Sequence, residues 1–274
     1  MKLKLLLLLI FCLLTVQVFT QDFTYISGAR SKALADHATT FTDHWSAINN
    51  QAGLGFVTAF SAGIYFENRF NLKELNSGTF TMAIPAGKQS AVGISLYAFQ
   101  QSVLFSRQKF GLGYGIKLSP TFSAGININL IRTSISDYAD NLSLCGEIGI
   151  LYMLTPKIRL GVHVFNPTAS KYRGNEEEKI PVMMRMGLSY SISQKTLILI
   201  EINNISFEGF GCKAAFEHHL SERFSLQAGL NTKNWISSFG LRLRLKNISL
   251  NIAMQFYQVL GSTPGISLDY TSFN

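Results

Sequence analysis

Alternation of apolar and polar residues is the feature that most constrains this chain, and it recurs from Thr58 to the C-terminus. In the stretch 184–192 every even position is apolar or aromatic, and every odd position is polar or glycine. A period of two residues predicts β-strands with one apolar face and one polar face. About fourteen such strands follow one another, near residues 58–68, 78–86, 90–98, 109–118, 121–134, 143–154, 157–166, 181–192, 195–204, 209–219, 223–232, 235–245, 247–257 and 263–272.

The residues on the two strand faces favour a membrane barrel over a soluble sandwich. Gly, Asn, Ser and Arg dominate the polar face, whereas the apolar face is aliphatic with aromatic residues near strand ends, such as Tyr190, Phe239 and Tyr270. The chain is 47% hydrophobic, yet no apolar run after the leader reaches the roughly 20 residues of a spanning helix. A closed barrel satisfies its backbone hydrogen bonds between strands. The predicted fold is therefore all-β, a transmembrane antiparallel β-barrel of about fourteen strands.

The connections between the predicted strands alternate in length. Tight turns are expected at 119–120, 155–157, 193–195, 221–222 and 246–247, and longer polar loops at 69–77, 99–108, 135–142, 167–180, 205–208 and 258–262. Short turns at one end and longer loops at the other are typical of outer-membrane barrels. We therefore expect the outer membrane of a Gram-negative bacterium, contact with its lipid, and both chain termini on the periplasmic side.

The first twenty residues predict a signal peptide. Two lysines, Lys2 and Lys4, precede an apolar run that ends near Val16, which is too short for a comfortable membrane span. Cleavage before Gln21 is expected, and the alternative is an uncleaved anchor. The chain then divides into a signal peptide at 1–20, an N-terminal segment at 21–57 and the barrel at 58–274.

Charge, cysteine and histidine content argue against several other functions. The net charge is +8, but the basic residues are scattered without a clustered patch, so nucleic acid is not an expected partner. Cys145 and Cys212 fall in separate strands and are expected to be free thiols. His37 and His44 lie beside acidic residues in the N-terminal segment, where a metal or acid–base role is conceivable. Because their spacing fixes no common face, we expect no enzyme, metal or cofactor.

The stretch from Gly28 to Leu54 is rich in small residues and contains Asn49-Asn50-Gln51 followed by Ala52-Gly53. Small residues allow close backbone packing, and Asn and Gly suit turns with positive φ. Such a segment can fold within a confined space, as a plug or hatch inside the barrel. The alternative is a periplasmic linker that leads into the first strand, and these residues do not decide between the two.

This stretch resembles the N-terminal motif of the FadL superfamily of outer-membrane barrels, and it is closest to the PorV/PorQ-like branch of Bacteroidetes. That pattern is roughly G-A-R-x-x-A-L-G-G-A followed by N-P-A-G-L. The chain departs from it at Ala35-Asp36, where the pattern has two glycines, and at Gln51, where it has proline. The stretch 161–167 is also similar to that branch. The motif residues that carry the resemblance are Gly28, Ala29, Arg30, Trp45, Asn49, Asn50 and Gly53.

The resemblance implies two functions. The first is a non-enzymatic accessory component of protein secretion or surface assembly, associated with type IX secretion and partnered by secretion-machinery or surface proteins. The alternative is a FadL-like transporter that passes a hydrophobic small molecule through a lateral gap in the barrel wall. A kinked strand at 83–87 could supply this gap, although the same stretch also suits an ordinary turn. The chain is shorter than fatty-acid transporters of the family, which implies that their long external loops are missing.

Strand parity predicts which polar side chains face the lumen. We expect them to pair with one another and with the N-terminal segment, because charges in a confined lumen stabilise each other by pairing. The alternative is a polar path for a solute. The predicted lumen-facing polar residues are Glu67, Asn127, Asn129, Arg185, Glu201, Arg242, Arg244 and Asp269.

Overall fold

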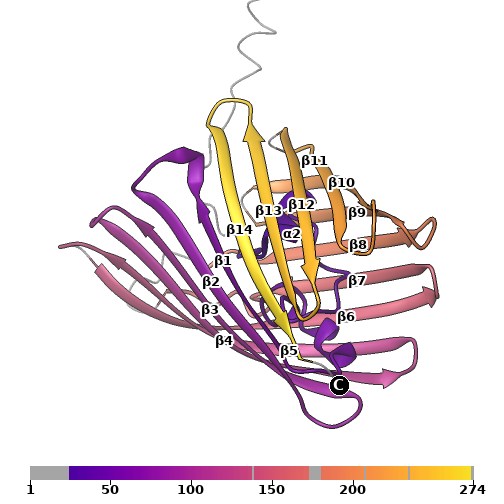
Figure 1. The fold of residues 1–274 in the computed structure, drawn as a ribbon. Helices are drawn as coiled ribbons and strands as arrows, with labels where there is room; N and C mark the ends of the chain where they lie inside the picture. The colour runs from indigo at the N-terminus through magenta and orange to yellow at the C-terminus, as the bar shows by residue number, and fades with distance from the viewer. Residues whose placement is uncertain (1–24, 138, 173–179, 207, 234, 273–274) are drawn as a thin grey trace, which may run out of the picture.

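The computed structural model describes residues 25–137, 139–172, 180–206, 208–233 and 235–272, so the predicted signal peptide lies outside the described residues. Fourteen antiparallel strands close into one barrel, in which sequence neighbours pair and β1 pairs with β14 (Figure 1). This confirms the predicted fold class, and predicted and observed strand ends differ by at most four residues. The strands are β1 (Ser61–Asn68), β2 (Leu75–Pro85), β3 (Ser90–Gln101), β4 (Phe105–Ser119), β5 (Phe122–Ile135), β6 (Ala139–Thr155), β7 (Ile158–Phe165), β8 (Met183–Ser191), β9 (Thr196–Ile205), β10 (Gly209–His219), β11 (Phe224–Asn231), β12 (Ile236–Leu245), β13 (Ile248–Tyr257) and β14 (Gly261–Thr271).

The alternation in sequence separates an apolar outer face from a polar inner face. On β5, Ile126 and Ile128 are 58% and 59% exposed, whereas Asn127 and Asn129 between them are buried. The same pattern holds on the other strands, where Leu, Ile, Met and Phe make up most of the exposed large side chains. The barrel therefore offers hydrocarbon on its outside and hydrogen-bonding groups on its inside, as a lipid environment requires.

The barrel has two distinct ends. We call the end where β1 begins and β14 ends the terminal end, and the opposite end the loop end. At the loop end only the connections 69–74 and 166–182 are long. The longer loops predicted at 99–108 and 135–142 are wrong, because β3, β4, β5 and β6 extend through most of those residues. Long paired strands satisfy more backbone groups than exposed loops would.

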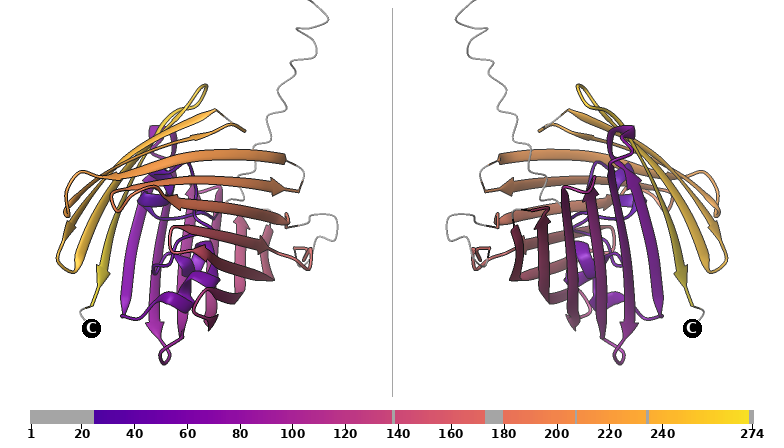
Figure 2. Two further views of the ribbon diagram at one scale, coloured as in Figure 1. Left: turned by 90° about the vertical axis from the view of Figure 1, so that its right-hand side faces the viewer. Right: turned by 90° about the vertical axis from the view of Figure 1, so that its left-hand side faces the viewer.

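Residues 25–57 lie inside the barrel (Figures 1 and 2). This N-terminal segment contains the short helices α2 (Ala29–Ala33) and α3 (Ser46–Asn49) and the 3₁₀ helix η1 (Gln51–Phe56). Helix α2 packs against β11 to β14, while α3 and η1 pack against β2 to β6. None of the helices in the described part of the chain is long and apolar enough to cross a membrane.

The N-terminal segment runs along the lumen from the loop end toward the terminal end. Its first described residue, Tyr25, packs edge-on against the Tyr97 ring at 5.2 Å and at a tilt against the Phe165 ring at 5.4 Å, both between ring centroids. The segment ends at Val57, just before β1 begins at the terminal end. The side of a membrane that each end would face remains a prediction.

Candidate functional site

The motif residues hold the N-terminal segment in its folded shape. The side chain of Asn49 accepts a hydrogen bond from the Ser27 amide at 3.2 Å and donates to the Ser27 carbonyl at 3.0 Å. Asn50 donates to the Thr39 carbonyl at 2.6 Å and accepts from the Ala52 amide at 3.2 Å. These two amides join parts of the segment that are 22 and 11 residues apart. They supply the pairing that a short irregular segment cannot obtain from secondary structure.

Glycine and tryptophan in the motif meet at a close contact. Gly28 has φ +99°, and a β-carbon there would lie 2.9 Å from the Trp45 ring. Only glycine combines this backbone angle with that space. The Trp45 indole donates to Asp269 of β14 at 3.0 Å. Gly53 is equally confined, because a β-carbon would overlap the Phe41 carbonyl and the Ser46 hydroxyl.

Arg30 anchors the segment to the wall. Its guanidinium donates to Glu217 of β10 at 2.6 Å and 3.0 Å, and it lies 4.0 Å above the Phe41 ring. The neighbouring Ala29 is fully buried and packs in the same cluster as Trp45. Hydrogen bonds between ionised groups are stronger than neutral ones, so this contact of two nitrogens with one carboxylate oxygen holds the segment against β10.

Glycines in the wall leave room for the N-terminal segment to pack closely against the strands. On β4 and β5, β-carbons at Gly115 and Gly125 would overlap the Gln51 backbone. On β7 and β8, β-carbons at Gly161 and Gly187 would overlap Thr39. The wall is therefore shaped to accept this segment in this position, since larger side chains at these sites would exclude it.

Two carboxylates organise the charged middle of the lumen. Glu147 accepts from Lys109 at 2.7 Å and from Gln51 of the segment at 2.8 Å, and it lies 2.9 Å from His163. Glu201 accepts from Lys213 at 2.8 Å, and its other oxygen accepts from the Thr39 hydroxyl at 2.8 Å. Both carboxylates are at most 1% exposed. Because the segment and the wall share these carboxylates, removing either side would leave buried charge uncompensated.

The structure places the predicted lumen-facing residues on the inner side of the wall, with different partners. Asn129 donates to Glu147 at 2.9 Å, and Asn127 donates to Asn129 at 3.0 Å. Arg185 donates to the Asn49 carbonyl and contacts His163, while Glu67 accepts from Arg69 at 2.8 Å. Arg242 donates to Asn251 at 2.7 Å. Arg244 differs from the others because it is exposed at the terminal end.

The prediction missed four lumen-facing residues that carry these contacts. Lys109, Glu147, Lys213 and Glu217 are all buried and all paired. Each lies on the polar face of its own strand's alternation. The signal was therefore present in the sequence, and reading the alternation of each of these strands separately would have found them.

The histidines of the segment are buried. His37 Nε2 lies 2.9 Å from the Thr40 hydroxyl, and its Nδ1 lies 3.9 Å from Glu201. Burial lowers the pKa of His37 to about 4, although Glu201 acts in the opposite direction. Burial also lowers the pKa of His44. Within the described residues, no group of three or more His, Cys, Asp or Glu side chains is placed to hold a metal.

An apolar cluster fills the lumen near the loop end. We call it the loop-end cluster, and its wall residues are Ile131, Cys145, Phe165, Met183 and Ile205. Tyr25 of the segment and Tyr172 and Ile180 of the connection 166–182 complete it. Cys145 is a free, buried thiol here, whereas Cys212 is free and exposed on the outer face.

Beside this cluster, β6 extends beyond its pairing with β7. The β6–β7 register begins at Glu147 and Phe165, while β6 itself starts at Ala139. Beyond this register the Asn166 amide still donates to the Gly146 carbonyl at 2.9 Å, and β7 forms no further strand pair with 139–145 among the described residues. A groove of about 300 Å³ lies at this edge, lined by Leu130, Leu142, Ser143, Leu144 and Lys171. The Ser143 hydroxyl is buried without a hydrogen-bond partner in the described structure.

Of the two alternatives for 83–87, the structure supports the ordinary turn and not a kinked strand with a lateral gap. Ala83 pairs with Ser61 of β1 and Gly93 of β3, and β2 continues in register to Pro85. The residues after Pro85 form an ordinary turn, closed by the Ala86 amide and the Ser90 carbonyl at 2.8 Å. The interruption of pairing lies instead on the β6 edge.

No protein-family model and no curated protein matches this chain, but solved structures share its fold. The toluene transporter TodX of P. putida has a TM-score of 0.71 and 12% identity, covering 90% of this chain and 99% of that chain. The toluene transporter TbuX of Ralstonia pickettii has a TM-score of 0.69 and 12% identity, covering 90% and 98%. A FadL homologue of Pseudomonas aeruginosa has a TM-score of 0.63 and 11% identity, covering 89% and 98%.

These comparisons establish a FadL-like fourteen-stranded fold. The similar structures are described as transporters or as a FadL homologue, and none of the three is described as an enzyme or a secretion component. The PorV/PorQ-like branch expected from the motif gains no support from them. Since a fold hosts many functions, what this chain carries must be argued from its own lumen and wall.

Proposed function

We propose that this protein is an outer-membrane barrel that moves hydrophobic small molecules between the loop end, its apolar lumen and the surrounding lipid. The observation that carries the proposal is the part of β6 that extends beyond its register with β7, which lies directly beside the loop-end cluster. Leu142 and Leu144 face outward at this edge, and Ser143 between them faces inward. An apolar molecule would therefore meet apolar side chains on both sides of the wall.

The filled middle of the lumen supports a lateral exit over a straight one. The N-terminal segment and the ion pairs of the wall beside it occupy the lumen between the loop-end cluster and the terminal end. An apolar molecule that crossed this region would have to displace buried charges from their partners, which costs several kcal/mol. The segment thus acts as a plug in this proposal. The similar structures described as toluene transporters agree with an apolar cargo.

The test is uptake of the apolar fluorophore N-phenyl-1-naphthylamine by Gram-negative cells that express the protein. Wild-type protein should raise the uptake rate several-fold over cells that carry an empty vector. Ser143→Trp would place an indole in the β6 edge and should return uptake to the empty-vector rate. The control, Ile128→Trp, adds the same side chain to the lipid-facing surface of β5 and should leave uptake unchanged.

Wild-type uptake equal to the empty vector, or Ser143→Trp uptake equal to wild type, would contradict the proposal. The second hypothesis, an accessory role in secretion or surface assembly, is favoured by one observation, the closely packed plug. It predicts a stoichiometric protein partner after purification of tagged protein from outer membranes in mild detergent. Such a partner together with unchanged fluorophore uptake would reverse the ranking of the two functions.

A further inference from the structure

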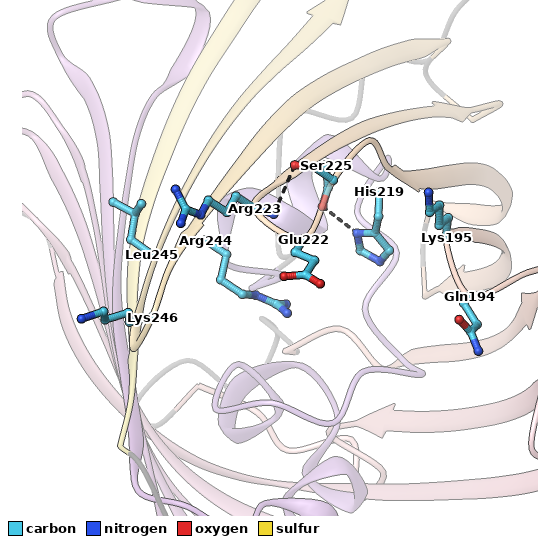
Figure 3. Close-up of a pocket in the computed structure, with 10 residues that line it drawn as sticks. Gln194, Lys195, His219, Glu222, Arg223, Ser225, Arg244, Leu245 and Lys246 are labelled. Atoms are coloured by element: carbon cyan, nitrogen blue, oxygen red, sulfur yellow. Dashed lines mark hydrogen bonds between the residues drawn. The ribbon is translucent and has the colours of Figure 1, made fainter.

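The terminal end of the barrel carries an open pocket that the transport proposal does not use. Its volume is about 1220 Å³, and it lies among the connections 192–195, 220–223 and 246–247 (Figure 3). These turns follow β8, β10 and β12. The pocket therefore opens to solvent on the side of the barrel opposite the loop-end cluster.

The lining of this pocket is strongly basic. It includes Lys195, Arg223, Arg244 and Lys246, and its one carboxylate belongs to Glu222. Four cations against one carboxylate give a formal excess of +3, with His219 counted as neutral. A concave surface with charge of one sign concentrates the field and raises the local concentration of ions of opposite charge.

The cations of the pocket differ from those deeper in the lumen because they have no carboxylate partner in the described part of the chain. Lys109 and Lys213 lie 2.7 Å and 2.8 Å from carboxylate oxygens. No described residue forms an ion pair with Lys195, Arg223, Arg244 or Lys246. Like charges that line one pocket repel each other, and a bound anion would relieve that repulsion.

Fixed backbone and side-chain contacts shape the pocket. His219 Nδ1 lies 2.6 Å from the Ser225 hydroxyl, and the Arg223 amide donates to the Ser221 hydroxyl at 3.3 Å. Figure 3 shows Arg244, Glu222 and His219 extending into the same space. Arg244 occupies the inward-facing parity of β12, and Arg223 lies on the turn between β10 and β11.

We propose that this pocket binds an anion with two or more negative charges, and that phosphate groups are its ligand chemistry. Arginine presents a planar fork of donors that matches phosphate oxygens, and the two lysines add charge without a directional requirement. The pocket is too wide for a single small ion and is open to solvent. A soluble phosphate compound and a phospholipid headgroup share this chemistry. The inference does not depend on the transport proposal.

The test is isothermal titration calorimetry of the full mature chain in phosphatidylcholine nanodiscs, with pyrophosphate as the probe. Wild-type protein should bind, and the double variant Arg223→Gln/Arg244→Gln should bind at least about tenfold more weakly, a loss of about 1.4 kcal/mol. The matched control is Lys88→Gln/Lys157→Gln, which removes the same charge from exposed turns of the same end outside the pocket. This control should bind as wild type does.

Repeating the titration in nanodiscs that contain phosphatidylglycerol distinguishes the two possible ligands, a soluble phosphate compound and a phospholipid headgroup. Weaker apparent pyrophosphate binding to the wild type in these nanodiscs than in phosphatidylcholine, with no such difference for the double variant, would identify the lipid headgroup as a competitor for the pocket. Unchanged binding would assign the pocket to a soluble anion. Absence of wild-type binding at millimolar pyrophosphate in phosphatidylcholine, or equal losses in the double variant and the control, would overturn the proposal.

Discussion

The middle of the lumen and the pocket at its terminal end contain the same kinds of charged side chain in opposite states. In the middle, Lys109 and Lys213 are buried and each lies within 2.8 Å of a carboxylate. In the pocket, Arg223 and Arg244 are exposed and have no carboxylate partner among the described residues. Pairing is obligatory where water is excluded, and it is optional where water can solvate the charge.

This difference separates the charges that stabilise the fold from the charges that attract a ligand. Charges in the middle fix the N-terminal segment against the wall and should determine stability. Charges in the pocket hold no part of the chain in place and should determine which ligand is attracted. The predictions that follow change the charge of selected groups and ask whether stability responds as this division requires.

The largest effect is expected from Glu201→Gln. Glu201 accepts from Lys213 and from the Ala38 and Thr39 amides, the latter two at 3.2 Å, and its side chain is fully buried. The glutamine side chain would leave Lys213 without its counter-charge. Its NH₂ group would also lie among groups that are themselves hydrogen-bond donors. We expect the free energy of unfolding to fall by about 3–5 kcal/mol, measured by guanidinium chloride titration in detergent.

The control for this prediction is Asp140→Asn, which breaks the Arg132–Asp140 pair on the exposed surface. Both side chains are about half exposed, at 54% and 51%, so water replaces the lost contact. The free energy of unfolding should hardly change. If both variants lost a similar free energy of unfolding, burial would not distinguish the two pairs. The proposed difference between buried and exposed charges would then be wrong.

Acidification should release the N-terminal segment through His37. The pKa of this buried histidine is lowered from 6.5 to about 4, first by burial and then by Lys213 and Arg185, against the opposing effect of Glu201. Between pH 6.5 and 4 the released segment binds a proton that the docked segment does not. Docking therefore weakens as the pH falls, by about 3 kcal/mol across this window.

Fluorescence of Trp45 reports this release, provided that the second tryptophan is removed by Trp235→Phe. The signal should change between pH 6.5 and 4 and remain constant above pH 7. In the same background, His37→Gln should flatten the dependence on pH, and the part that remains should come from His44, whose pKa burial also lowers. An identical pH dependence in the histidine variant would rule out His37 as the group responsible.

Much of the fold could be predicted because the alternation with a period of two follows directly from strand geometry. Residues such as Asn127 and Ile128 need only their parity to be assigned to the inner or the outer face. The loop lengths were predicted less well, since polar residues near strand ends suit both a loop and the inner face of a long strand. β6 illustrates this, because its first residues were expected to be a loop.

The interior contacts depend on information that local sequence does not contain. Gln51 replaces the proline of the family pattern, and its amide reaches Glu147, 96 residues away. Ala35 and Asp36 stand where the pattern has two glycines, and both adopt positive φ, at 56° and 63°. The two glycines of the pattern therefore stand at positions that take a left-handed conformation in this chain, which aspartate adopts more readily than alanine.

The smallest effect on stability is expected from the double variant Arg223→Gln/Arg244→Gln. Neither guanidinium contributes an ion pair to the described structure, and removing two like charges from one pocket reduces their mutual repulsion. The free energy of unfolding should change by less than about 0.5 kcal/mol, in the same guanidinium chloride titration used for Glu201→Gln. A loss of several kcal/mol would show that these arginines support the fold, and the pocket would then belong with the paired middle of the lumen. A small change together with weakened pyrophosphate binding would place ligand attraction and stability in separate parts of one lumen.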